Sequence, residues 1–170
     1  MYNRVIVPLD GSELAEGAIS EAVELARNMG ERLHFLRVVD TTWAGRYGLY
    51  GLAIESSAVD RLLRADREAA SVYVGQLQAR LESTGIHVTA EVREGRAADE
   101  IVAAARPGDL IVMASHGRTG AKRFALGSVA EDVARHAAVP VMLCRVVKGA
   151  GPQHMPSLDV GVASLRVGVA

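Results

Sequence analysis

A chain of 170 residues, 49% of them hydrophobic, predicts one globular domain with a single core. Lysine and arginine number 19 against 20 aspartate and glutamate residues, so the charge gives no reason to expect nucleic acid or an anionic membrane surface as a partner. No apolar run reaches the roughly 20 residues that span a bilayer, and the single cysteine, Cys144, excludes an intrachain disulfide.

The chain begins with a strand and a helix. Residues 1–4 carry no signal-peptide pattern, which leads us to expect a cytoplasmic protein. The apolar run at residues 5–9 predicts a buried strand, and Ser12 is a good N-cap for the helix that follows. Apolar residues recur every three or four positions as far as Met29, so we expect one helix that Gly30 ends in a left-handed conformation.

A second strand, residues 33–39, leads into a long connection, residues 40–55. This connection holds three of the seven aromatic residues, Trp43, Tyr47 and Tyr50. They either anchor a surface loop to the body of the protein or form a flap over a bound adenine.

The rest of the chain alternates helices with strands. Residues 57–83 have helical periodicity, with a predicted core-facing stripe of Leu62, Leu63, Ala69, Val72, Leu77 and Leu81. A strand near a sheet edge (87–92), a short helix (97–105), a buried strand (110–114), a helix from Ser128 to about residue 136 and a last strand (141–146) follow. Such alternation indicates a parallel sheet with helices on both faces, which binds ligands at the carboxyl ends of its strands.

The loop between the strand at 110–114 and the helix at Ser128 has the features of a phosphate site. It holds Gly117, Gly120 and Gly127, and its three cations, Arg118, Lys122 and Arg123, face no carboxylate within the loop. Strand, glycine loop and helix N-terminus together form the usual cradle for a phosphate group. We therefore interpret this segment as a nucleotide-phosphate site.

The spacing of this loop resembles one family. Ala114-Ser-His-Gly117, nine further residues and Gly127-Ser128 are similar to the G-x-x-G-x9-G-[S/T] signature of the ATP-binding universal stress proteins. The resemblance covers residues 1–147 and implies an α/β fold, an open five-stranded parallel sheet in the order 3-2-1-4-5 of the adenine-nucleotide alpha-hydrolase type. One position departs from the signature, because Ala114 replaces its first glycine; the methyl group could crowd a ligand, or be harmless if φ is negative.

The predicted site combines residues from three strand ends with the loop. Asp10, just past the first strand, could accept hydrogen bonds from a ribose, help to hold a metal, or bond its own turn. Ser128 could donate to a phosphate or cap its helix. The resemblance assigns further positions to the nucleotide. Among them, Val38 and Met113 either lie against the adenine or only pack in the core. The full candidate set is Pro8, Leu9, Asp10, Val38, Met113, Ala114, His116, Gly117, Arg118, Gly120, Gly127, Ser128 and Val129.

The resemblance implies a stress-response protein that binds ATP, with Mg or Mn held through the phosphates, and acts as a sensor or regulator. A slow ATPase or autophosphorylating enzyme is one alternative, although the sequence has no P-loop, nucleophile elbow or kinase signature. A nucleotide-free dimeric interaction module is the other. The resemblance also implies a homodimer that pairs through the edge strand at residues 141–146. Residues 148–170 lie beyond the resemblance and could form two short strands or be disordered.

Overall fold

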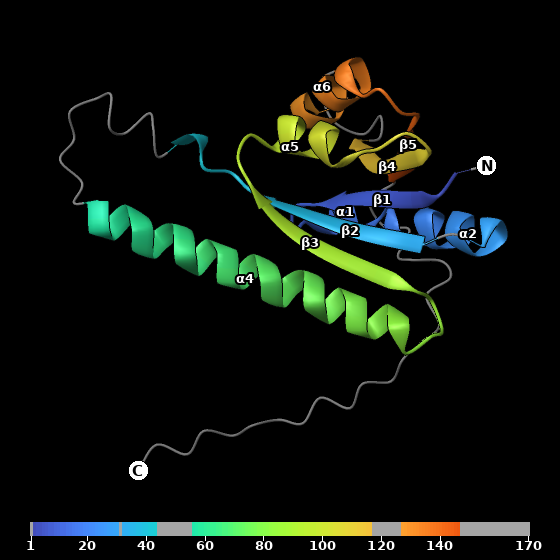
Figure 1. Ribbon diagram of the computed structural model, residues 1–170, viewed down its shortest axis with the longest axis horizontal. Helices are drawn as coiled ribbons and strands as arrows, with labels where there is room; N and C mark the ends of the chain where they lie inside the picture. The colour runs from blue at the N-terminus through green and yellow to red at the C-terminus, as the bar shows by residue number, and fades with distance from the viewer. Residues whose placement is uncertain (1, 31, 44–55, 117–126, 147–170) are drawn as a thin grey trace, which may run out of the picture.

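The computed structural model describes residues 2–30, 32–43, 56–116 and 127–146. Five strands form one parallel sheet in the order β3-β2-β1-β4-β5, which confirms the predicted order (Figure 1). Their bounds are Arg4–Leu9 (β1), Arg32–Val39 (β2), Val88–Glu94 (β3), Asp109–His116 (β4) and Val141–Val146 (β5). Tyr47, Tyr50 and the segment 148–170 lie outside the described residues.

Helices cover both faces of the sheet and divide the core into two halves. On one face lie α1 (Glu13–Glu16), α2 (Ile19–Met29) and α4 (Ser56–Glu82), and on the other lie α5 (Ala97–Ala104) and α6 (Ser128–His136). Because successive strand residues point to opposite faces, Leu33 and Phe35 of β2 join the first half of the core, whereas Leu36 and Val38 join the second. None of the helices among the described residues has the length and apolar character needed to cross a membrane.

The first helical segment differs from the expected single helix. Ser12 is the N-cap, as predicted, and its hydroxyl accepts a hydrogen bond from the Ala15 amide at 3.1 Å. The helix, however, ends after four residues, and α2 begins only at Ile19. The break falls at Gly17, a poor helix former. Gly30 ends α2 with φ at +68°, the left-handed conformation that the sequence predicted.

The predicted core-facing stripe of α4 was partly wrong. Leu77 and Leu81 are buried, but the other buried positions are Ala70 and Val74. Leu62 is 51% exposed and Val72 is 58% exposed. Figure 1 shows that the first turns of α4 extend past the sheet, so no strand lies beneath the beginning of the helix. Val72 lies farther along, between the buried Ala70 and Val74, and is on the solvent face.

Candidate functional site

A cavity of about 260 Å³ lies at the carboxyl ends of β1, β2 and β4. In the sheet, β2 lies on one side of β1 and β4 on the other, so the strand order reverses at this point. Nine of the thirteen candidate residues line this one cavity: Pro8, Leu9, Asp10, Val38, Met113, Ala114, Gly127, Ser128 and Val129. The fold thus brings together residues that are more than 100 positions apart in the chain.

The end of β1 places a carboxylate at the rim of the cavity. Asp10 Oδ1 accepts hydrogen bonds from the Ser12 amide at 2.9 Å and the Ser12 hydroxyl at 2.6 Å, so the turn holds the side chain in place. Partial burial raises the pKa of Asp10, but the hydrogen bonds from Ser12 and the charge of Arg37 outweigh it and leave that pKa below its ordinary value. Asp10 is therefore ionised at neutral pH. Asp10 thus stabilises its own turn through Oδ1, and Oδ2 remains available to a ligand.

The N-terminus of α6 also points to the cavity. Gly127 occupies the N-cap position with φ at +87° and ψ at +138°, a conformation that L-residues rarely adopt. Ser128 is the first residue of the helix, so the interpretation of Ser128 as the cap is wrong. Because a glycine cap has no side chain to accept from the first amides, those N–H groups can bind an anion.

The wall of the cavity between these two polar ends is apolar. Val38 and Met113 are only 8% and 7% exposed and belong to the half of the core beneath α5 and α6. Eight further lining residues were not in the candidate set: Ser12, Leu14, Ala15, Leu36, Arg37, Ala97, Ile101 and Ala130. Ala97 and Ile101 lie four positions apart on α5 and therefore share one face of the helix. This apolar spacing, combined with the sheet order, could have identified them.

Ala114, which replaces the signature glycine, lines the cavity but also contacts protein. Its side chain is partly buried and packs against the half of the core that contains α2. Met113 lies in the other half, as alternation along β4 requires. The methyl group is thus at least partly accommodated by the core.

The remaining candidates lie at or beyond the edge of the described structure. His116 is the last residue of β4 and pairs in register with Val146 of β5. Gly117, Arg118 and Gly120 lie outside the described residues, as do Lys122 and Arg123. In the parts of the chain that are described, no group of three or more His, Cys, Asp or Glu side chains could hold a metal ion.

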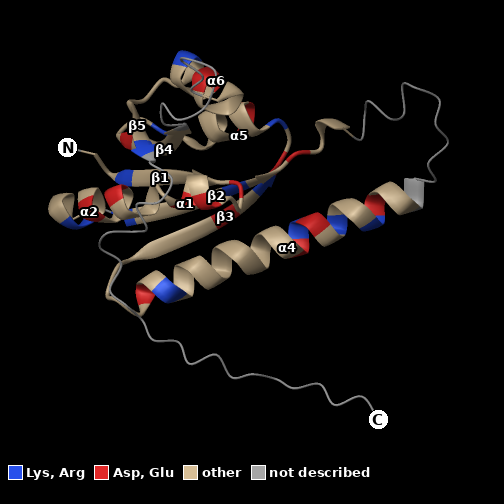
Figure 2. Cartoon of the chain, turned by 180° about the vertical axis from the view of Figure 1, so that it is seen from behind, with Lys and Arg blue, Asp and Glu red and all other residues tan. Residues whose placement is uncertain are grey.

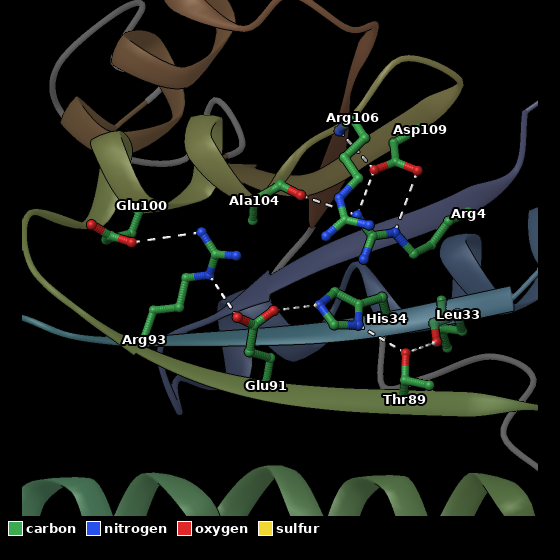
Figure 3. A network of polar contacts seen from close by, with 10 residues as sticks. All are labelled: Arg4, Leu33, His34, Thr89, Glu91, Arg93, Glu100, Ala104, Arg106 and Asp109. Atoms are coloured by element: carbon green, nitrogen blue, oxygen red, sulfur yellow. Dashed lines mark hydrogen bonds and ion pairs between the residues drawn. The ribbon is translucent and has the colours of Figure 1, made fainter.

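Two groups of polar contacts lie on the α5 face of the sheet, apart from the cavity (Figure 3). Arg4 of β1 and Asp109 of β4 are partners in register, and Arg4 Nη2 donates to Asp109 Oδ2 at 2.6 Å. Asp109 also accepts from the Arg106 amide at 2.9 Å. Burial raises the pKa of Asp109, but the hydrogen bonds from Arg4 and Arg106 outweigh it and hold that pKa below its usual range.

A second group of contacts is centred on His34 of β2 (Figure 3). His34 is 6% exposed, and its Nδ1 lies 2.8 Å from the hydroxyl of Thr89, its partner in register on β3. Its Nε2 has no hydrogen-bond partner among the described residues, although Glu91 Oε2 lies 3.4 Å away. These contacts join β2 to β3, whereas the Arg4–Asp109 pair joins β1 to β4. Arg4 and Asp109 stand at the beginnings of their strands, away from the cavity, and His34 is not among the residues that line it.

Cys144 and Ser115 provide no nucleophile for the cavity. Burial raises the pKa of the Cys144 thiol to about 11, so the thiol stays protonated. Ser115 is buried and donates its hydroxyl proton to the Cys144 carbonyl at 3.2 Å. Neither side chain is among the residues that line the cavity.

Comparison with known proteins identifies similar chains. The model of the universal stress protein family matches residues 1–145. Universal stress protein MJ0531 of Methanocaldococcus jannaschii is 32% identical over 152 residues, 87% of this chain and 85% of that protein. The solved structure of universal stress protein UspA from Lactobacillus plantarum has a TM-score of 0.70 at 29% identity and covers 85% of this chain and 98% of its own.

Two more distant structures of the same fold contain nucleotides. A universal stress protein in complex with cAMP has a TM-score of 0.52 at 21% identity, over 85% of this chain and 97% of that one. The Arabidopsis thaliana protein At3g01520, with AMP bound, has a TM-score of 0.56 at 16% identity, over 88% of this chain and 97% of that one.

Proposed function

The chain belongs to the universal stress protein family, and we propose that it binds ATP in the cavity at the carboxyl end of the sheet and acts as a nucleotide-dependent sensor or regulator. One observation carries the proposal. A single cavity combines a carboxylate on β1, an apolar wall and a glycine-capped helix N-terminus, which match ribose, adenine and phosphate in chemistry.

The three parts of the ligand have separate partners in this proposal. Adenine lies against Val38 and Met113, with the backbone of Pro8 and Leu9 at its edge. Asp10 accepts from the ribose hydroxyls through Oδ2, because its Oδ1 already serves Ser12. The triphosphate binds the backbone N–H groups of residues 127–129 and the loop candidates His116, Gly117, Arg118 and Gly120.

The proposal includes a divalent cation held mainly by the phosphates. Mg²⁺ is commonly bound by one or two carboxylates together with substrate phosphates. The described residues offer Asp10 at the cavity rim and no larger group of metal ligands. We therefore expect Mg or Mn to bind with the nucleotide rather than to the protein alone.

Nucleotide carried through purification provides the first test. The full-length protein, denatured with acid after purification, should release ATP or a related adenine nucleotide. Calorimetric titration of the nucleotide-free protein with ATP, with and without Mg²⁺, should then give saturable binding of one nucleotide per chain. Absence of both release and binding would leave the alternative of a nucleotide-free interaction module.

The enzymatic alternatives have less support. A slow ATPase or an autophosphorylating enzyme needs a general base or a positioned nucleophile next to the phosphates. Among the residues that line the cavity, Asp10 is the one acidic side chain. The hydroxyl that it accepts from, that of Ser12, caps α1 in the turn after β1, whereas we place the phosphates at the N-terminus of α6. Multiple-turnover release of phosphate from ATP would separate an enzyme from a sensor.

We further propose a homodimer that forms through β5. This strand lies at the edge of the sheet, and its residue Met142 is 38% exposed. Pro140 precedes the strand and cannot donate a hydrogen bond to a neighbouring strand, which suits an edge position. An apolar edge strand tends to pair with another strand unless it is protected, and a two-fold contact closes the assembly at two chains.

A further inference from the structure

A second cavity, of about 490 Å³, lies on the face of β2 that α4 covers. Odd-numbered residues of β2 point to this face, and the cavity is formed between the end of β2, the turn after β1 and the middle of α4. The side chains that matter for its chemistry are Arg37, Asp40, Trp43, Asp66, Ala69 and Tyr73. Of these, only Arg37 also lines the cavity proposed for ATP.

Two aromatic side chains and small residues shape this cavity. Trp43 and Tyr73 contribute aromatic side chains to the lining, and the small side chains of Ala69 and Ala70 leave room between α4 and the sheet. Tyr73 donates its hydroxyl proton to Glu16 Oε1 at 2.9 Å, which fixes the ring. Burial, together with this contact, raises the pKa of Tyr73, so its phenol stays neutral.

The charges around the cavity are predominantly negative. Asp40 Oδ1 accepts from the Thr42 amide at 2.8 Å and the Thr42 hydroxyl at 2.6 Å, and these bonds lower the pKa of Asp40. Asp66 is an exposed carboxylate on α4, in the charged first half of that helix that Figure 2 shows. Arg37, the one cation among the described residues that line the cavity, is directed toward the end of β1, where it donates to the Leu9 carbonyl at 3.4 Å and lies close to Asp10.

We propose that this second cavity binds a small organic cation with a flat apolar body, an arylalkylamine in chemical class. Aromatic rings attract a cation through their negative faces and also stack on a flat group, and the two carboxylates supply charge complementarity. An anionic ligand would face Asp40 and Asp66 with only Arg37 in its favour. The inference does not depend on ATP binding, because the residues proposed to hold the cation, Asp40, Trp43, Asp66 and Tyr73, do not line the cavity proposed for ATP.

The test uses phenethylamine as the cationic ligand and 3-phenylpropionate as its anionic counterpart. Trp43 is the only tryptophan in the chain, so its fluorescence reports on this cavity directly. Titration of the full-length protein with phenethylamine should change the fluorescence saturably, with the same affinity by calorimetry. No saturable change, or equal binding of 3-phenylpropionate, would overturn the proposal.

Variants then locate the binding. Asp66→Asn and Asp40→Asn each remove one charge while keeping the size of the side chain, and each should weaken phenethylamine by about fivefold, as expected for a partly screened ion pair. Asp60→Asn is the matched control, because Asp60 is exposed on the same helix and does not line the cavity.

Filling the cavity provides a test that does not involve charge. Ala69→Leu should abolish binding, whereas Ala65→Leu, at an exposed alanine of α4 outside the cavity, should not. Unchanged affinity in Ala69→Leu, or equal loss in the variant and its control, would overturn the assignment to this cavity. All five variants change exposed residues, so we expect them to fold, and unchanged thermal unfolding would verify that.

Discussion

Replacement of Gly127 by valine tests the proposed phosphate site. The β-branched side chain would stand over the first N–H groups of α6, where we place the phosphates. Each charge-assisted hydrogen bond contributes about 1.5–3 kcal/mol, so the loss of two should weaken ATP by at least about 100-fold. Calorimetric titration with ATP measures this change.

The same substitution also strains the backbone, and the cost can be estimated. At φ +87° and ψ +138° an L-residue costs about 1–3 kcal/mol. This is less than the roughly 5–15 kcal/mol that stabilises a typical domain, so the variant should fold. For a chain of this length, Tm should fall by about 2–12 °C.

A second glycine separates strain from steric blocking. Gly85 has φ at +82°, and a Cβ added there would meet no atom within 4 Å. It follows α4 in the turn before β3 and does not line the cavity. Gly85→Val should therefore lower Tm similarly and leave ATP affinity unchanged. Wild-type affinity in Gly127→Val, or an equal loss of affinity in both variants, would refute the phosphate assignment.

Three further predictions concern charge, pH and assembly. Neutralising Arg118, Lys122 and Arg123 together should weaken ATP more than adenosine, and the difference should shrink in high salt; equal losses for both ligands would contradict a phosphate role. Burial and the nearby Arg4 lower the pKa of His34, and Glu91 and Asp109 offset this only in part. His34 is therefore protonated near pH 6.5 in the unfolded chain but only at lower pH in the folded chain. The free energy of unfolding should thus fall as the pH drops below about 6.5 toward the lower folded-state pKa. Urea unfolding across this range should show a weaker dependence in His34→Gln. Met142→Glu should convert the proposed dimer to a monomer by light scattering, and a dimer that persists in this variant but is lost from a chain ending at Lys148 would move the interface to the C-terminal segment.

The strands and their order could be predicted because the relevant signals are local or come from the family resemblance. Each central strand is a short apolar run with turn residues on both sides, and the resemblance supplied the order in the sheet. Gly30 could be assigned as a helix end because a glycine directly after an amphipathic run is itself a stop signal. These features do not depend on knowing what packs against them.

The errors come from features that only tertiary packing decides. Helix α4 carries two overlapping apolar stripes, one through Leu62 and Val72 and one through Ala70 and Val74. Periodicity gives both equal weight, and the position of the sheet beneath the second half of the helix selects the latter. The break at Gly17 is similarly ambiguous in sequence, since isolated glycines are tolerated inside many helices.

The candidate site was predictable in its polar parts and less so in its walls. Asp10 and Gly127 stand directly after a strand and directly before a helix, and such positions meet at one edge of a parallel sheet. Ala97 and Ile101 reach the cavity because α5 crosses over β2 and β1, which the spacing within α5 does not reveal. The contacts of Arg4, His34 and Asp109 are made with residues on neighbouring strands, so they could not be predicted without the strand register.

The end of β2 explains why two cavities occur at one edge of the sheet. Alternation sends Leu36 and Val38 toward α5 and Arg37 and Val39 toward α4. The first pair is purely apolar and suits a base, whereas the second brings a cation that the turn after β1 already binds through the Leu9 carbonyl. A shift of β2 by one residue would exchange these walls and turn Arg37 into the half of the core beneath α5 and α6, where burial would penalise its charge. The register of β2 is thus a condition for both proposed sites, and the contact of His34 with Thr89, its partner on β3, is compatible with this register alone.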